Sequence, residues 1–208
     1  MARARLTFRR LSGLDRSGPS PPETQAGAPL RPWTIPNAIG YVRLALIPVF
    51  VVLAFSSDTG TEPLPAILFA VITWGDYADG IAARVTGQYS RLGALLDPVV
   101  DRLIVLAGVV VCWHFELLPR WAIAVLAGRE AFMLIAGQYA VRHGVTVAIN
   151  WPGRWSVWPL MSAIFFALCG LENPAAVLLY VGLALAIWAT VLYGRSAVRQ
   201  LRKPSIST

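Results

Sequence analysis

Long stretches of this chain consist almost entirely of hydrophobic residues, and short polar segments separate them. Most stretches reach the roughly 20 residues that an α-helix needs to cross a bilayer, and the fifth is at the short limit. The separating segments carry Gly, Pro, Asn and Ser, which are typical of turns. The pattern predicts an all-α integral membrane protein with six transmembrane helices, at residues 37–57, 64–86, 92–115, 119–141, 155–171 and 174–194.

The composition agrees with a membrane protein. Of the 208 residues, 56% are hydrophobic and only 14% are charged, whereas a soluble domain usually has about 25% charged residues. Residues 1–32 differ from the rest, because they are rich in Arg, Pro, Gly and Ser and lack apolar periodicity. We expect a disordered basic tail there, a membrane domain at residues 33–195 and a short basic cytoplasmic tail at 196–208. The first tail either contacts anionic lipid headgroups or acts only in setting the topology.

The distribution of basic residues predicts the orientation in the membrane. Six spans place both termini on one side, and the loops expected on the other side contain only Arg120 as a basic residue. By the positive-inside rule both termini are cytoplasmic, so the net charge of +7 reflects topology and not nucleic-acid binding. The basic residues on the cytoplasmic side are Arg3, Arg5, Arg9, Arg10, Arg16, Arg31, Arg84, Arg91, Arg142, Arg154, Arg195, Arg199, Arg202 and Lys203.

Four aspartates stand where the second apolar stretch ends and the third begins. At membrane depth each ionised side chain costs about 2.5–3.5 kcal/mol. Asp76 and Asp79 share one helix face, and Asp97 and Asp101 share one face of the next helix. A turn around residues 87–90 would bring the four carboxylates into one small volume. Such a cluster needs a positive partner, and a hard divalent cation such as Mg²⁺ is the obvious candidate.

Charge and depth leave two classes of function open. One is a membrane enzyme for phosphoryl transfer, in which two metal ions hold the attacking and leaving oxygens. The other is a divalent-cation or proton-coupled transporter, since carboxylates within a membrane also line ion pathways. The aspartates are expected at the membrane edge and not at its midplane, which favours the enzyme. Arg84, one turn beyond the acidic face, is suited to binding a phosphate.

The aspartates belong to a longer pattern, D-x2-D-G-x2-A-R-x8-G-x3-D-x3-D. It resembles the signature of the CDP-alcohol phosphatidyltransferases. The segments TIPNAIGYVR at 34–43 and RLGALLDPVVDRL at 91–103, with the Arg129–Glu130 pair, resemble the branch that makes phosphatidylglycerophosphate or cardiolipin. The resemblance covers about residues 34–195.

The resemblance implies a six-helix enzyme of the cell membrane, typically a homodimer, with its active site open to the cytoplasmic leaflet. The implied reaction is transfer of a phosphatidyl group from CDP-diacylglycerol to an alcohol, with release of CMP. The implied cofactor is Mg²⁺ or Mn²⁺, as two ions. We favour glycerol 3-phosphate as the acceptor. Phosphatidylglycerol, which would give cardiolipin, is the close alternative, and inositol phosphate is a weaker third.

The resemblance also implies a role for each position of the pattern. Asp76, Asp79 and Asp97 would ligate metal, and Asp101 would be the general base on the acceptor hydroxyl while also touching a metal ion. The residues that would pack against or bind the cytidine diphosphate part are Gly80, Ala83, Arg84 and Gly93.

Two arginines outside the pattern are candidates for binding an anionic acceptor. Arg129 either forms a mutually satisfying buried pair with Glu130 or holds the acceptor near the carboxylates. Arg154, in the segment WPGRW, either binds a second phosphate or is an interfacial residue that sets the topology.

Two glycines depart from the pattern of the branch. Gly40 stands where Thr or Ser is common, and Gly75 stands where Ser commonly precedes the first aspartate. Both lie outside the eight-residue pattern, but they weaken the assignment to one acceptor.

Overall fold

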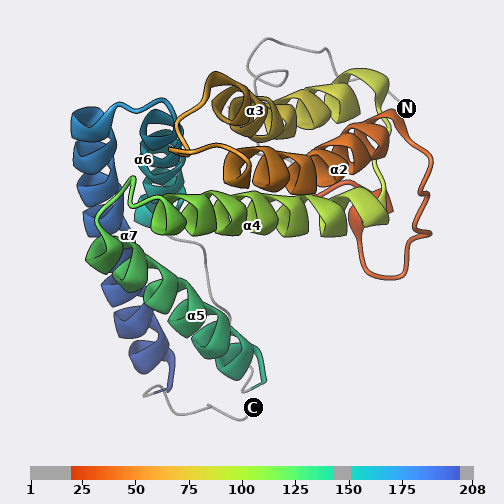
Figure 1. The fold of residues 1–208 in the computed structure, drawn as a ribbon. Helices are drawn as coiled ribbons and strands as arrows, with labels where there is room; N and C mark the ends of the chain where they lie inside the picture. The colour runs from red at the N-terminus through yellow and green to blue at the C-terminus, as the bar shows by residue number, and fades with distance from the viewer. Residues whose placement is uncertain (1–19, 143–150, 202–208) are drawn as a thin grey trace. The chain divides into compact units, whose positions relative to one another are not determined.

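The computed structural model describes residues 20–142 and 151–201. In these residues the secondary structure is entirely helical, which confirms the all-α class (Figure 1). Each α-helix corresponds to one of the expected apolar stretches. The elements are η1 (Pro22–Thr24), α2 (Ile35–Phe55), α3 (Pro63–Thr86), α4 (Arg91–His114), α5 (Arg120–Arg142), α6 (Trp151–Leu168) and α7 (Glu172–Leu201).

Among the described helices, three are long and apolar enough to cross a membrane by length and composition. They are α2, α3 and the part of α7 from Glu172 to Arg195. The apolar part of α6, Trp155–Leu168, is shorter. Many large apolar side chains are exposed, such as Trp74, which is 69% exposed. This is the surface expected of helices that face lipid, whereas six spans and cytoplasmic termini stay predictions.

The chain divides into two compact units, Met1–Val111 and Cys112–Thr208. In the first unit α2 packs on α3, with the rings of Phe50 and Phe69 buried 5.7 Å apart. In the second unit α7 packs against both α6 and α5. All the expected motif residues between Asp76 and Asp101 belong to the first unit.

A tight connection joins α3 to α4, as the sequence predicts. Gly87 ends α3 with φ +65°, a left-handed conformation that favours glycine. Ser90 precedes α4, and its Oγ accepts a hydrogen bond from the backbone N–H of Gly93 at 2.9 Å. The side chain of Gln88 accepts from the backbone N–H of Ile35 at 2.9 Å. The connection is therefore tied to the first turn of α2 as well as to its own helices.

Part of the N-terminal segment at 1–32, where the composition predicts disorder, makes hydrogen bonds with α2 and α4. The backbone N–H of Leu92 donates to the carbonyl oxygen of Leu30 at 3.2 Å. The amide of Asn37 donates to the carbonyl oxygens of Arg31 and Pro32, at 3.0 and 3.1 Å. Residues 20–32 therefore pack on the first unit, and residues 1–19 lie outside the described residues.

The expected C-terminal tail at 196–208 is described only in part. There α7 continues to Leu201, so the first residues of that tail are helical. Residues 202–208 lie outside the described residues.

Candidate active site

The carboxylates of α3 and α4 converge, as their helical spacing predicts, and the cation between them is Arg43 of α2. Its Nη1 lies 2.8 Å from Oδ2 of Asp79 and 3.4 Å from Oδ1 of Asp76. Its Nη2 lies 2.8 Å from Oδ1 of Asp101. One guanidinium of α2 thus contacts three of the four aspartates and joins α2 to α3 and α4.

The surroundings of Arg43 account for its burial. Its side chain is only 3% exposed, and its Nε donates to the carbonyl oxygen of Ile72 at 2.9 Å. A buried charge costs several kcal/mol unless paired, and the three carboxylates supply that pairing. A Cβ at Gly75 would lie 2.8 Å from Cδ of Arg43, so the glycine makes room for the arginine.

Burial divides the cluster into a closed side and an open side. The side chain of Asp79 is 5% exposed, whereas those of Asp76 and Asp101 are 49% and 45% exposed. A small molecule or ion can therefore reach Asp76 and Asp101 from outside.

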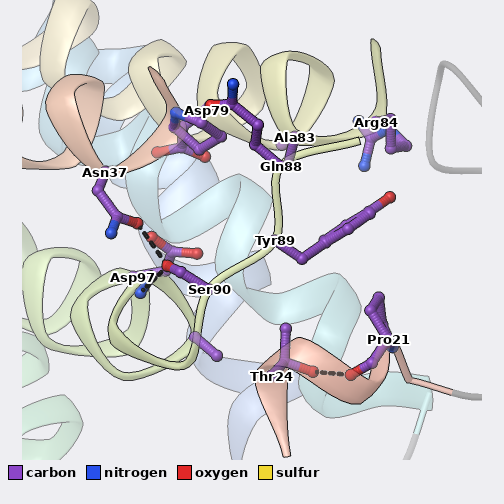
Figure 2. Close-up of a pocket in the computed structure, with 14 residues that line it drawn as sticks. Pro21, Thr24, Asn37, Asp79, Ala83, Arg84, Gln88, Tyr89, Ser90 and Asp97 are labelled. Carbon is purple, nitrogen blue, oxygen red and sulfur yellow. Dashed lines mark hydrogen bonds between the residues drawn. The ribbon is translucent and has the colours of Figure 1, made fainter. Parts of the chain in front are cut away.

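Asp79 and Asp97 also line a pocket of about 280 Å³ (Figure 2). Six of the eight pattern residues line it, namely Asp79, Gly80, Ala83, Arg84, Gly93 and Asp97. The rest of its wall comes from the segment before α2, the start of α2 and the region where α4 begins: Pro21, Thr24, Pro36, Asn37, Gln88, Tyr89, Ser90 and Ala94. The two remaining pattern residues, Asp76 and Asp101, connect to Asp79 through Arg43.

Asn37 and Ser90 hold the floor of this pocket in place. Asn37 is 1% exposed, and its Oδ1 accepts a hydrogen bond from Oγ of Ser90 at 2.8 Å (Figure 2). A Cβ at Gly93 would lie 2.7 Å from that Oδ1, which is closer than real Cβ contacts. Gly93 therefore lets the first turn of α2 approach α4, in addition to bordering the pocket.

The aspartates suit a divalent cation in their chemistry, because Mg²⁺ and Mn²⁺ prefer oxygen ligands. Three carboxylates already converge on one cation. The negative charge of Asp97 is near enough to those of Asp76 and Asp101 to be repelled by them. Within the described residues, however, no three acidic, His or Cys side chains have the spacing of a metal site. The guanidinium of Arg43 stands among the carboxylates. Binding a divalent ion there would require the carboxylates to rearrange around it.

The two candidates for acceptor binding are placed in the second unit. Arg129 donates from Nε to Oγ1 of Thr190 at 3.0 Å and forms an ion pair with Glu130. These contacts agree with the buried-pair interpretation of Arg129 and leave its acceptor role a prediction. Arg154 lies in the first turn of α6, and its side chain is outside the described part of the structure.

Sequence reasoning did not assign a role to Arg43, Asn37 or Ser90. A signal for Arg43 was present, because it is a lone cation in an otherwise apolar stretch of a chain whose next span ends in acidic residues. Intramembrane charges usually pair with one another. Asn37 and Ser90 lie 53 residues apart, and nothing local in the sequence indicates that they meet.

The chain is similar to known proteins over most of its length. A family model described as CDP-alcohol phosphatidyltransferase matches residues 33–188. A cardiolipin synthase (CMP-forming) of Streptomyces coelicolor is 36% identical over 166 residues, which cover 77% of this chain and 77% of that protein. A CDP-diacylglycerol–glycerol-3-phosphate 3-phosphatidyltransferase of Bacillus subtilis is 29% identical over 174 residues, covering 77% and 89%. One of Pectobacterium atrosepticum is 29% identical over 182 residues, covering 83% and 99%. The chain therefore belongs to the CDP-alcohol phosphatidyltransferase family.

Proposed function

We propose that this enzyme transfers the phosphatidyl group of CDP-diacylglycerol to the hydroxyl of an alcohol and releases CMP. The observation that carries the proposal is the pocket in which six of the eight pattern residues meet beside the carboxylate cluster. Two of the helices that line the pocket, α2 and α3, are long and apolar enough to cross a membrane, which suits a substrate whose acyl chains stay in the bilayer. A new phosphorus–oxygen bond forms to the acceptor, and the bond to the CMP oxygen breaks.

The proposed acceptor is glycerol 3-phosphate, and the product is phosphatidylglycerophosphate. Relatives from Bacillus subtilis and Pectobacterium atrosepticum that carry this activity in their names support it. The 36% identity to the Streptomyces coelicolor cardiolipin synthase favours a second candidate, phosphatidylglycerol. Inositol phosphate is a weaker third candidate.

In the proposed site, two divalent cations, either Mg²⁺ or Mn²⁺, bind to the carboxylates of Asp76, Asp79 and Asp97. The family generally depends on divalent metal. When bound, such ions neutralise charge on the pyrophosphate, on which phosphoryl transfer largely depends. Asp101, which is partly exposed and also near the ions, accepts the proton of the attacking hydroxyl as general base.

The pocket wall receives the cytidine diphosphate part of the lipid. Gly80, Ala83 and Gly93 provide a surface with little side-chain bulk, and Arg84 supplies a positive charge for a phosphate. A Cβ at Gly80 would lie 3.4 Å from Nη1 of Arg84, so the absence of a side chain keeps space beside that guanidinium. Arg129 and Arg154 are proposed contacts of an anionic acceptor.

The proposed setting is the cell membrane, with the pocket and both termini on the cytoplasmic side. The basic residues near the ends of the apolar stretches support this orientation. A homodimer is proposed from the family resemblance.

The test is a reaction with purified protein in detergent, CDP-diacylglycerol and Mg²⁺, with each acceptor offered in turn. We expect CMP and phosphatidylglycerophosphate when glycerol 3-phosphate is present. If the protein instead makes cardiolipin from phosphatidylglycerol and does not react with glycerol 3-phosphate, the acceptor is phosphatidylglycerol. Metal flux into vesicles, with no CMP released from CDP-diacylglycerol whichever acceptor is offered, would instead indicate a transporter.

A further inference from the structure

The three carboxylate oxygens that Arg43 contacts belong to residues proposed to serve the metal ions and the acceptor. Nη1 reaches Asp76 and Asp79, and Nη2 reaches Asp101, at 2.8–3.4 Å. Carboxylate oxygens such as these are the ligands that Mg²⁺ and Mn²⁺ prefer. A guanidinium N–H and a metal ion cannot both occupy the same lone pair of a carboxylate oxygen. Arg43 and a metal ion would therefore compete for these oxygens.

Electrostatics makes this competition substantial. Like charges a few ångströms apart repel each other, and the repulsion is stronger where protein shields them from water. If Arg43 kept its contacts with Asp76 and Asp79, its positive charge would lie beside any divalent ion held by the same two carboxylates. The guanidinium therefore opposes metal binding unless it moves away from part of the cluster.

The same contacts are favourable in the absence of metal. Asp79 is almost fully buried and Arg43 more so, and a buried charge left without a partner destabilises a fold strongly. Arg43 supplies the counter-charge that keeps α3 and α4 together around Asp79 and Asp101. A metal ion that enters from the open side, where Asp76 and Asp101 are about half exposed, would take over this role.

We propose that Arg43 is an internal counter-ion that stabilises the metal-free carboxylate cluster and must leave Asp76 and Asp79 when a divalent cation binds. This inference rests on the metal-binding role in the proposed function. Arg43 acts through the aspartates and is a positioning residue, because its side chain is turned to the cluster and away from solvent.

The first test titrates the wild-type protein and the Arg43→Gln variant with Mn²⁺. Electron paramagnetic resonance of the free ion measures how much Mn²⁺ stays unbound. Removing the competing charge should tighten Mn²⁺ binding by at least about tenfold, a size typical of coupling between sites. Without metal, the variant should unfold at a lower temperature than wild type. Added Mn²⁺ should raise its unfolding temperature by more than it raises that of wild type, because binding stabilises the folded state.

A second variant displaces the arginine without changing any charge. In Gly75→Ala the new Cβ would lie 2.8 Å from Cδ and 2.9 Å from Cγ of Arg43, so the side chain must shift. We expect tighter Mn²⁺ binding in this variant too, in the same direction as for Arg43→Gln. If Arg43→Gln fails to fold, Gly75→Ala alone still measures the effect of displacing Arg43 on Mn²⁺ binding.

The matched control is Arg120→Gln, which also removes one arginine from an ion pair, in this case with Glu116 at 3.0 Å. Its Mn²⁺ affinity should stay within twofold of wild type. Unchanged or weaker binding in both Arg43→Gln and Gly75→Ala, with normal binding by wild type, would overturn the role of Arg43. A wild-type protein that binds no Mn²⁺ would instead refute the metal sites of the proposed function.

Discussion

The four aspartates of the pattern have different surroundings despite their identical chemistry. Asp79 is buried against Arg43, whereas Asp76 and Asp101 contact the same guanidinium from partly exposed positions. Asp97 borders the pocket beside Asp79. An acceptor hydroxyl needs a carboxylate that it can reach, and the exposure of Asp101 meets that requirement.

Asp101→Asn tests the base directly. The amide keeps the size of the carboxylate and can still accept a hydrogen bond from Arg43, but it cannot take a proton. We expect CMP release to fall by about 10²–10⁴-fold, the range for general acid–base catalysis, while binding of CDP-diacylglycerol is retained. Both are measured on the same preparation, and near-normal turnover would contradict the assignment.

Gly93→Ala tests the close approach of Asn37. The new Cβ would lie 2.7 Å from Oδ1 of Asn37, which is buried and held by hydrogen bonds. Such overpacking should reduce the free energy of unfolding by about 1–3 kcal/mol, measured by denaturant titration in detergent. In the control, Gly128→Ala, no atom lies within 4 Å of the new Cβ. That variant should be neutral or more stable by up to about 1 kcal/mol, because Ala favours a helix more than Gly.

At the scale of elements, the start of α4 depends on contacts from two directions. Ser90 caps the helix through the N–H of Gly93 and at the same time donates to Asn37 of α2. Thr34 caps α2 in a similar way, since its side chain accepts from the N–H of Asn37. The beginnings of α2 and α4 are therefore joined, and both border the pocket.

Ser90→Ala should show this double role. It removes a helix cap, worth about 0.5–2 kcal/mol, and leaves Oδ1 of buried Asn37 without this donor. We expect a loss of about 2 kcal/mol in unfolding free energy. Ser56→Ala removes an exposed hydroxyl that donates to the carbonyl oxygen of Val52, and it should change stability little. Equal effects of the two substitutions would refute the shared role of Ser90.

At the scale of the whole molecule, the pocket is formed within the first unit, which also includes part of the N-terminal segment. Pro21 and Thr24 line the pocket, and Leu30 bonds to Leu92 at the start of α4. Among its described residues, the N-terminal segment thus contributes Pro21 and Thr24 to the site.

Two truncations test this contribution. Deleting residues 2–19 keeps every described residue of the pocket wall, and CMP release should stay within about twofold of the full chain. Deleting residues 2–31 removes Pro21, Thr24 and the contact of Leu30, and CMP release should fall at least tenfold, because small misplacements in an active site cost about 10²-fold. Equal activity of the two truncated proteins would mean that residues 20–31 do not shape the site.

Local features of the sequence were sufficient to predict the helices and the convergence of the aspartates. Apolar stretches of about 20 residues have one stable form in a bilayer, which is a helix. Residues three and four apart share a helix face, so the spacing from Asp76 to Asp101 predicts two facing acidic arrays. The family pattern relates this spacing to a reaction.

Only the tertiary structure decided which cation lies among the aspartates and why particular glycines stand where they do. Arg43 is 33 residues from Asp76 and 58 from Asp101 along the chain, and their contact depends on how α2 packs against α3 and α4. Gly40 and Gly75, which depart from the branch pattern, allow close approach of Leu96 and Arg43. Periodicity specifies the face of a single helix, but the partner of that face is selected by packing between helices distant in sequence.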